Sequence, residues 1–154
     1  MKSPLLLILL LVAAPPTWAD ELIATCKIES GKSATLSWNT AANALKLQLQ
    51  KKNKPPVVIL SKIPAVIWKE DGLVEKRYFF ESNEMRFQFI ATKDDSRARV
   101  PVLISRARNG GWFSEEPCTK SEVRADFNPP SSIPIALDSM EAFTAAFGKD
   151  WVED

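Results

Sequence analysis

The chain has 154 residues, in which 20 lysine and arginine side chains are balanced by 19 aspartate and glutamate side chains, and it contains no histidine. The lack of histidine excludes Ser-His-Asp and Cys-His nucleophile pairs, histidine-liganded zinc and imidazole acid–base catalysis. Its five glycines stand in neither of the common glycine-rich spacings that build a phosphate-binding loop.

Residues 1–19 have the features of a secretory signal peptide. Lys2 precedes an apolar run from Leu5 to Ala14, and the small residue Ala19 stands at the expected cleavage site. The run is about ten residues long, whereas a membrane-spanning helix needs roughly 20, so we expect no membrane insertion after cleavage. Cleavage removes one lysine and no acid, which leaves zero net charge and argues against a nucleic-acid partner. A periplasmic or secreted location follows.

Cys26 and Cys118 are the two cysteines of the chain. Exported cysteines in even number usually pair, so the sequence predicts a Cys26–Cys118 disulfide. Attachment of a lipid to Cys26 is the less favoured alternative, because the segment from Pro15 to Thr25 separates it from the apolar run. Pairing would also exclude thiolate catalysis and thiolate metal sites.

From Leu22 to Phe113 apolar and polar residues alternate with a period of two, the pattern of half-buried β-strands. The clearest cases are 34–39 and 43–50, which we expect to form a hairpin. The other predicted strands are 22–28, 56–60, 65–68, 73–80, 84–91, 98–106 and 111–114. Turn-forming Gly, Asn, Asp and Ser residues separate them. The sequence therefore predicts an all-β fold, an antiparallel meander of about eight short strands forming a barrel or sandwich.

The pattern changes after Cys118. Residues 120–137 contain three prolines and little periodicity, which predicts an extended connector on the surface. A capping sequence at 138–141 then predicts a helix from Ser139 to Phe147. Its apolar stripe of Met140, Phe143 and Phe147 is expected to dock on the β domain, and the alternative is a partner-binding helix.

We thus expect a signal peptide at 1–19, a disulfide-closed β domain at 20–119, a proline-rich connector at 120–137, and a docked C-terminal helix and tail at 138–154.

Six side chains are candidates for contact with a partner: Arg77, Phe79, Arg97, Arg99, Arg106 and Arg108. Four of the arginines bracket the predicted strand 98–106. Pro101 lacks an N–H for the ladder, so this strand is expected at a sheet edge or with a bulge. Val100, Val102 and Ile104 are expected to face the core. Charged edge strands commonly prevent sheets from pairing edge to edge, which is the structural alternative to partner binding.

The aromatic run Tyr78-Phe79-Phe80 places rings on both faces of its strand. If one face meets water, Phe79 is exposed beside Arg77, a combination common at protein interfaces. The alternative is that the C-terminal segment covers this face. The structural alternative for Arg77 is charge compensation: Arg77 and Glu75 on strand 73–80 and Arg86 and Glu84 on strand 84–91 can offset one another across the paired strands.

The sequence favours a protein without enzymatic activity. The paired carboxylates Glu70-Asp71, Asp94-Asp95 and Glu115-Glu116 fall at predicted turns or a strand end. Adjacency in sequence does not place two carboxyls across a cleft, as glycoside hydrolysis requires. No metal or cofactor is expected.

Two classes of function remain. The first is a binding module that engages another envelope or secreted protein, as an inhibitor or immunity protein does. In general plan the chain is similar to small periplasmic lysozyme inhibitors, which are also exported β-barrels. Their motif places an aromatic shortly after a Ser-Gly pair, whereas Lys32, Ser33 and Ala34 follow Ser30-Gly31 here, so no functional residue is carried over.

The second class is a small-ligand carrier of the β-barrel type, and a structural envelope component is a further alternative. The predicted inward side chains are bulky, which favours a filled interior. They are Leu36, Trp38, Leu45, Leu47, Leu49, Phe87 and Phe89. A cavity above about 300 Å³ would reverse that preference.

Overall fold

The computed structural model describes residues 19–70, 73–93, 100–124 and 135–151. It confirms a mostly β fold with one short C-terminal helix. The strands are β1 (Glu21–Ile28), β2 (Lys32–Asn39), β3 (Ala44–Lys51), β4 (Val57–Ser61), β5 (Val66–Glu70), β6 (Leu73–Glu81), β7 (Met85–Lys93), β8 (Val102–Ala107), β9 (Phe113–Val123) and β10 (Ile135–Leu137). The helix α1 (Met140–Phe147) and the 3-10 turn η1 (Lys149–Trp151) follow.

The predicted signal peptide falls outside the described residues except for Ala19. Within the described ranges no helix is long and apolar enough to cross a membrane.

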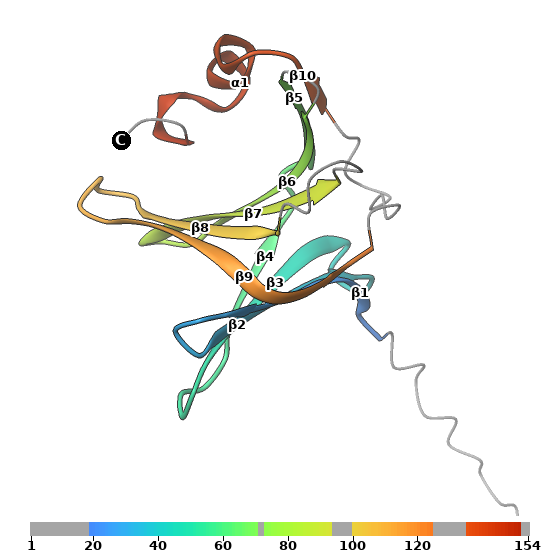
Figure 1. The fold of residues 1–154 in the computed structure, drawn as a ribbon, viewed down its shortest axis with the longest axis vertical. Helices are drawn as coiled ribbons and strands as arrows, with labels where there is room; N and C mark the ends of the chain where they lie inside the picture. The colour runs from blue at the N-terminus through green and yellow to red at the C-terminus, as the bar shows by residue number, and fades with distance from the viewer. Residues whose placement is uncertain (1–18, 71–72, 94–99, 125–134, 152–154) are drawn as a thin grey trace, which may run out of the picture.

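All ten strands belong to one sheet, in the order β10-β5-β6-β7-β8-β9-β1-β2-β3-β4. Neighbours are antiparallel, apart from the parallel pair β10 and β5. Pairing of β1 with β9 joins the start of the meander to its end, so that β4 and β10 are the terminal strands. The sheet curls into a half-barrel and brings β4 beside β6 (Figure 1), although no ladder joins these two strands in the described part of the chain.

The expected hairpin is β2 and β3, with Leu36 opposite Leu47 and Trp38 opposite Leu45. Asn39 begins its turn by accepting a hydrogen bond from the N–H of Ala42 at 2.6 Å. Side chains alternate between the two faces along each strand, so the leucines of β2 and β3 lie on one face. This alternation is why the hairpin could be predicted from the sequence.

The concave face of the half-barrel carries the main core. All seven side chains expected to point inward are buried there. The predicted disulfide is present: Cys26 on β1 and Cys118 on β9 lie with their Cα atoms 5.2 Å apart. It reinforces the β1–β9 pairing that connects the two ends of the meander.

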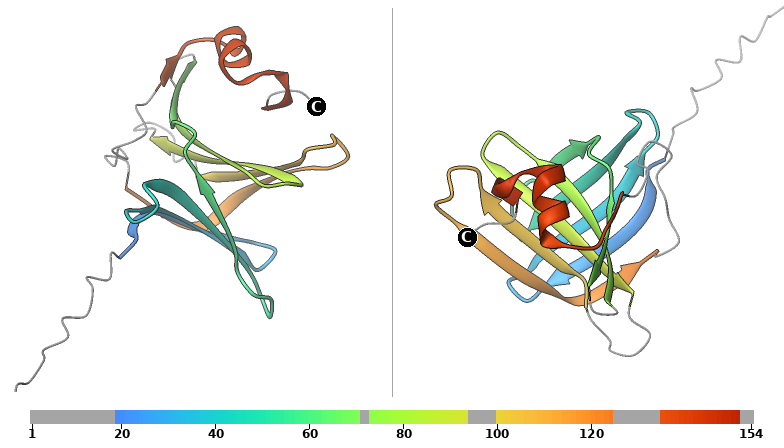
Figure 2. Two further views of the ribbon diagram at one scale, coloured as in Figure 1. Left: turned by 180° about the vertical axis from the view of Figure 1, so that it is seen from behind. Right: turned by 90° about the horizontal axis from the view of Figure 1, so that it is seen from above.

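A second core lies on the other face of the sheet, where side chains of β5, β6 and β10 pack against α1 and η1. Figure 2 shows the C-terminal helix over this face. Phe143 of α1 packs edge-on to Trp68 of β5 and against Phe79 of β6, with ring centroids 5.5 Å and 5.6 Å away. Ser139 caps the helix by accepting a hydrogen bond from the Ala142 N–H at 3.1 Å. Met140, which was expected in the docking stripe, is 47% exposed. The docked face is therefore narrower than the sequence suggested.

The two ends of the expected connector at 120–137 are extended, but they pair as strands of the sheet. β9 continues to Val123 because β1 offers it a partner as far as Ala24. Residues 135–137 form β10, which adds to the free edge of the short strand β5. The end of β9 and the position of β10 are both set by backbone hydrogen bonds to a neighbouring strand. The alternation of apolar and polar residues within a segment does not reveal whether such a neighbour is present.

The prediction that the Pro101 strand is an edge strand is wrong. β8 begins at Val102, after the proline, and lies between β7 and β9. The missing N–H therefore falls outside the β8 ladder. The expected direction of its side chains is also wrong, because Leu103 and Ser105 are buried whereas Val100 is 48% exposed. Apolar residues stand at both odd and even positions of this strand, so the sequence pattern alone could not show which face is buried.

Candidate functional site

The six candidate partner-contact residues do not form one surface in the structure. Arg97 and Arg99 lie outside the described residues. Phe79 is 0% exposed, so of the two alternatives that the sequence left open, a surface ring or a ring covered by the C-terminal segment, the second is correct. Phe147 and Trp151 cover it, with ring centroids 5.1 Å and 5.2 Å away. The C-terminal segment thus buries the face that the sequence left open.

Arg77 belongs to the same second core. Its guanidinium lies 4.9 Å from the centre of the Trp68 ring and donates to Glu75 at 2.9 Å. A cation over an aromatic face with a paired carboxylate is a stabilising arrangement inside a partly buried layer. Arg77 therefore fits the structural alternative rather than a partner surface.

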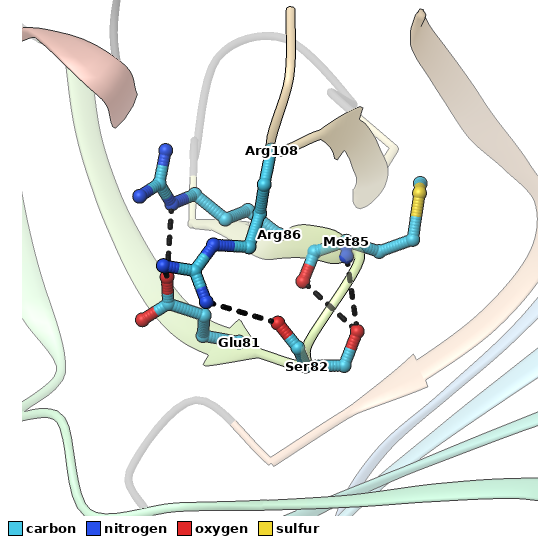
Figure 3. Close-up of polar contacts among 5 residues, drawn as sticks. All are labelled: Glu81, Ser82, Met85, Arg86 and Arg108. Carbon is cyan, nitrogen blue, oxygen red and sulfur yellow. Dashed lines mark hydrogen bonds and ion pairs between the residues drawn. The ribbon is translucent and has the colours of Figure 1, made fainter.

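Arg108 connects two turns of the half-barrel (Figure 3). Its guanidinium lies 3.3 Å from the Glu81 carboxylate and 3.5 Å from the Ser82 carbonyl oxygen. Arg86 reaches the same carboxylate at 3.2 Å. Ser82 in turn closes the β6–β7 turn, accepting from the Met85 N–H at 3.0 Å and donating to its carbonyl at 3.2 Å. This network fixes the β6–β7 turn against the β8–β9 turn.

Arg106 lies 5.2 Å above the ring of Phe113, its cross-strand partner on β9. Phe113 and the preceding Trp112 are 44% and 49% exposed. An exposed aromatic pair beside arginines therefore exists, but at the β8–β9 turn instead of at Phe79.

The strongest candidate site is a cavity of about 550 Å³ at one end of the half-barrel. The turns between β1 and β2, β3 and β4, β6 and β7, and β8 and β9 all lie at this end, on the left of Figure 1. The cavity is lined by Lys32, Leu49, Lys51, Lys54, Pro55, Val57, Ile59, Ser82, Asn83, Glu84, Met85, Phe87, Ser105 and Trp112. Its walls come from β3, β4 and the turn between them on one side, and from the β6–β7 turn, β7 and β8 on the other.

The inner surface of the cavity is apolar and contains one buried hydroxyl. Leu49, Ile59 and Phe87 are each less than a tenth exposed. Ser105 is 1% exposed, and its Oγ has no hydrogen-bond partner among the described residues. A buried hydroxyl without a partner costs free energy, so a ligand that offers it a hydrogen bond gains from that pairing.

Charge is distributed unevenly around the opening. Lys32 forms an ion pair with Glu116. Lys51 and Lys54 are exposed and have no ion-pair partner within the described ranges. Glu84 stands on the β6–β7 turn, which forms a separate wall of the cavity.

Two groups away from the cavity have shifted pKa values. The hydrogen bond from Lys46 lowers the pKa of Asp20. Burial raises the pKa of the Tyr78 phenol well above its usual range. The part of the chain that the structure describes contains no group of three side chains able to hold a metal ion. The arrangement at the cavity supplies shape, apolar contact, cations and a hydroxyl, which suit binding.

The sequence interpretation did not identify the cavity. One signal was available at residues 51–54, where three lysines flank Asn53 at a turn. Another was Ser105, a polar residue two positions from Leu103 on the same face of a mostly apolar strand. Neither signal reveals a cavity, because its walls come from strands that meet only through the curl of the sheet.

Comparison of the chain with protein-family models, with curated proteins and with solved structures found no match.

Proposed function

We propose that the protein is an exported, non-enzymatic binding module that takes up a small molecule in the cavity at the open end of its half-barrel. The observation that carries this proposal is the cavity of about 550 Å³, a volume above the lower limit of roughly 300 Å³ for small-molecule sites. A disulfide is consistent with an oxidising compartment, which supports export.

The lining supports binding of a molecule with an apolar body. Leu49, Ile59 and Phe87 would replace water around such a body, and the free-energy gain is about 25 cal/mol for each Å² of apolar surface buried. Ser105 would orient it through a hydrogen bond. This division between apolar walls and few polar contacts is common in small-molecule sites.

Two neighbouring valines of β4 provide a matched test. Val57 and Val58 are 56% and 49% exposed, but only Val57 is among the lining residues. We expect Val57→Trp to fill the cavity and Val58→Trp to leave it open. N-phenyl-1-naphthylamine, a neutral fluorescent probe with an apolar body, should bind the parent chain and Val58→Trp. It should lose most of its binding to Val57→Trp. Equal binding of the probe to both variants would refute the proposal.

Ser105→Ala offers a second readout. The free protein should become slightly more stable, because the variant removes a buried hydroxyl that has no described partner. A ligand that bonds Ser105 should bind this variant more weakly. A loss of stability in the free protein would show that the hydroxyl is already satisfied there.

A protein partner is the second candidate, favoured by the exposed aromatics at the β8–β9 turn. Arg106 lies over the ring of Phe113, and Trp112 precedes it in the chain; tryptophan and arginine are frequent in binding hot spots. Phe113 does not line the cavity, so Phe113→Ala separates the two functions. Loss of a captured partner by this variant, with retained probe binding, would support the second candidate.

A further inference from the structure

We infer that the ligand is an anionic amphiphile, a molecule with a carboxylate or phosphate group and an apolar body. Its anionic group would lie at Lys51 and Lys54 on the rim, and its body would lie on Leu49, Ile59 and Phe87. This inference rests on the proposed function, namely that the cavity binds a small molecule.

The charges of the lining residues support an anion. Three of the lining side chains are lysines and one is a glutamate, Glu84. The charge of Lys32 is offset by Glu116, which is not itself a lining residue. Lys51 and Lys54 remain as cations that no described carboxylate neutralises. An anionic group at this rim would gain favourable interactions with both ammonium groups.

The turn that carries these lysines is held in place by its own hydrogen bonds. The Lys54 N–H donates to the Lys51 carbonyl at 3.2 Å, and the Gln50 side-chain amide donates to the carbonyl oxygens of both lysines. Asn53 takes the left-handed conformation that closes the turn, with a φ of 60°. The backbone under the two cations is therefore ordered before a ligand binds, which reduces the entropy lost on binding.

Glu84 sets the orientation of the ligand. It belongs to the β6–β7 turn, whereas Lys51 and Lys54 belong to the β3–β4 turn. A carboxylate beside Glu84 would be repelled, and one beside the lysines would be attracted. The anionic group is thus expected at the β3–β4 turn, with the apolar body directed over Phe87 toward Ser105.

The test compares probes that share one apolar chain and differ in charge. Decanoate, decyl phosphate, 1-decanol and decylammonium are titrated separately into the mature chain by calorimetry. We expect the two anions to bind about threefold to tenfold more tightly than the alcohol, since one or two exposed ion pairs contribute this much. Decylammonium should bind most weakly. Added salt should reduce the preference for the anions, because exposed charges are screened. A preference for only one of the anions would identify which headgroup the site takes.

Lysine variants locate the anion site. Lys51→Gln with Lys54→Gln should abolish the difference between decanoate and 1-decanol. The control is Lys52→Gln, which removes a cation from the same turn at a position that does not line the cavity. Glu84→Gln should strengthen decanoate binding and weaken decylammonium binding.

The outcomes separate the two proposals. Equal binding of all four probes would leave the cavity as a ligand site and overturn the inferred charge. A preference for anions that survives in the double lysine variant would overturn the placement at Lys51 and Lys54. Failure of all four probes and of the neutral fluorescent probe would refute the proposed function itself.

Discussion

Cys26 of β1 and Cys118 of β9 are joined across the one strand pair that connects the beginning of the meander to its end. They are 92 residues apart in sequence, and their Cα atoms lie 5.2 Å apart. A cross-link over so long a loop restricts the unfolded chain strongly, and the loop-entropy estimate is about 4 to 5 kcal/mol.

The first prediction concerns this bond. Cys26→Ala combined with Cys118→Ala should lower the free energy of unfolding by up to about 4 to 5 kcal/mol, as measured by denaturant titration. A reductant should destabilise the parent chain similarly and leave the double variant unchanged. If reduction leaves the denaturation midpoint of the parent chain where it was, the disulfide is not a major source of stability.

The second prediction concerns the C-terminal segment. Phe143 is 1% exposed and contacts Trp68, Phe79 and Phe147. Phe143→Ala should destabilise the docking of α1 by about 3 to 5 kcal/mol and expose residues 135–151 to proteolysis. Met140→Ala, on the same helix but at a position 47% exposed, should change stability by less than about 0.5 kcal/mol. Similar proteolysis of both variants would contradict this assignment of the helix faces.

The third prediction uses the single tyrosine of the chain. Burial raises the pKa of Tyr78, so its tyrosinate absorbance should appear well above pH 10 in the folded protein and near pH 10 in guanidinium. Because the folded-state pKa is the higher one, the stability contributed by Tyr78 is fully present below about pH 10. It declines as the pH rises beyond that value.

Tyr78→Phe is the control for this pH dependence. Lysines titrate in both proteins, so the melting temperature of both should fall above about pH 10. It should fall less steeply in the variant, which lacks the buried phenol. Ionisation of Tyr78 near pH 10 in the folded protein would show that the phenol is exposed to solvent.

The fourth prediction separates the two ion pairs of Glu81. Arg86 and Arg108 lie at almost the same distance from this carboxylate, 3.2 Å and 3.3 Å. The Arg86 side chain is 13% exposed and that of Arg108 is 44% exposed, so solvent screens the second pair more. Double-mutant cycles should therefore give the larger coupling energy for Glu81 with Arg86, with both values of about 1 kcal/mol or less. A larger coupling to Arg108 would indicate that burial does not control these pairs.

Much of the half-barrel could be predicted because its signals are local. Leu45, Leu47 and Leu49 alternate with polar residues, and a strand buried on one face is the structure that this period favours. The Cys26–Cys118 pair followed from the even cysteine count together with the signal peptide expected at residues 1–19. The helix from Met140 to Phe147 followed from its cap and its spacing.

The failed predictions share a physical cause. Pro101, which lacks an N–H, suggested an edge strand, but a strand becomes an edge or an interior strand only when its neighbours are placed. Phe79 has the same local sequence whether it faces water or Phe143. Burial of a sheet face depends on what packs against it, and here the covering segment lies more than 60 residues further along the chain.

The sequence by itself therefore determined the strand periodicity, the capped helix, the absence of histidine chemistry and the pairing of the cysteines, because each depends on composition or short-range spacing. The tertiary structure alone decided that Phe79 is covered, that β8 is an interior strand and that a cavity forms beside Ser105. The first depends on the docking of the C-terminal segment, and the second on the pairing of β8 with β7 and β9. The cavity depends on the curl of the sheet, which the sum of many small strand twists sets.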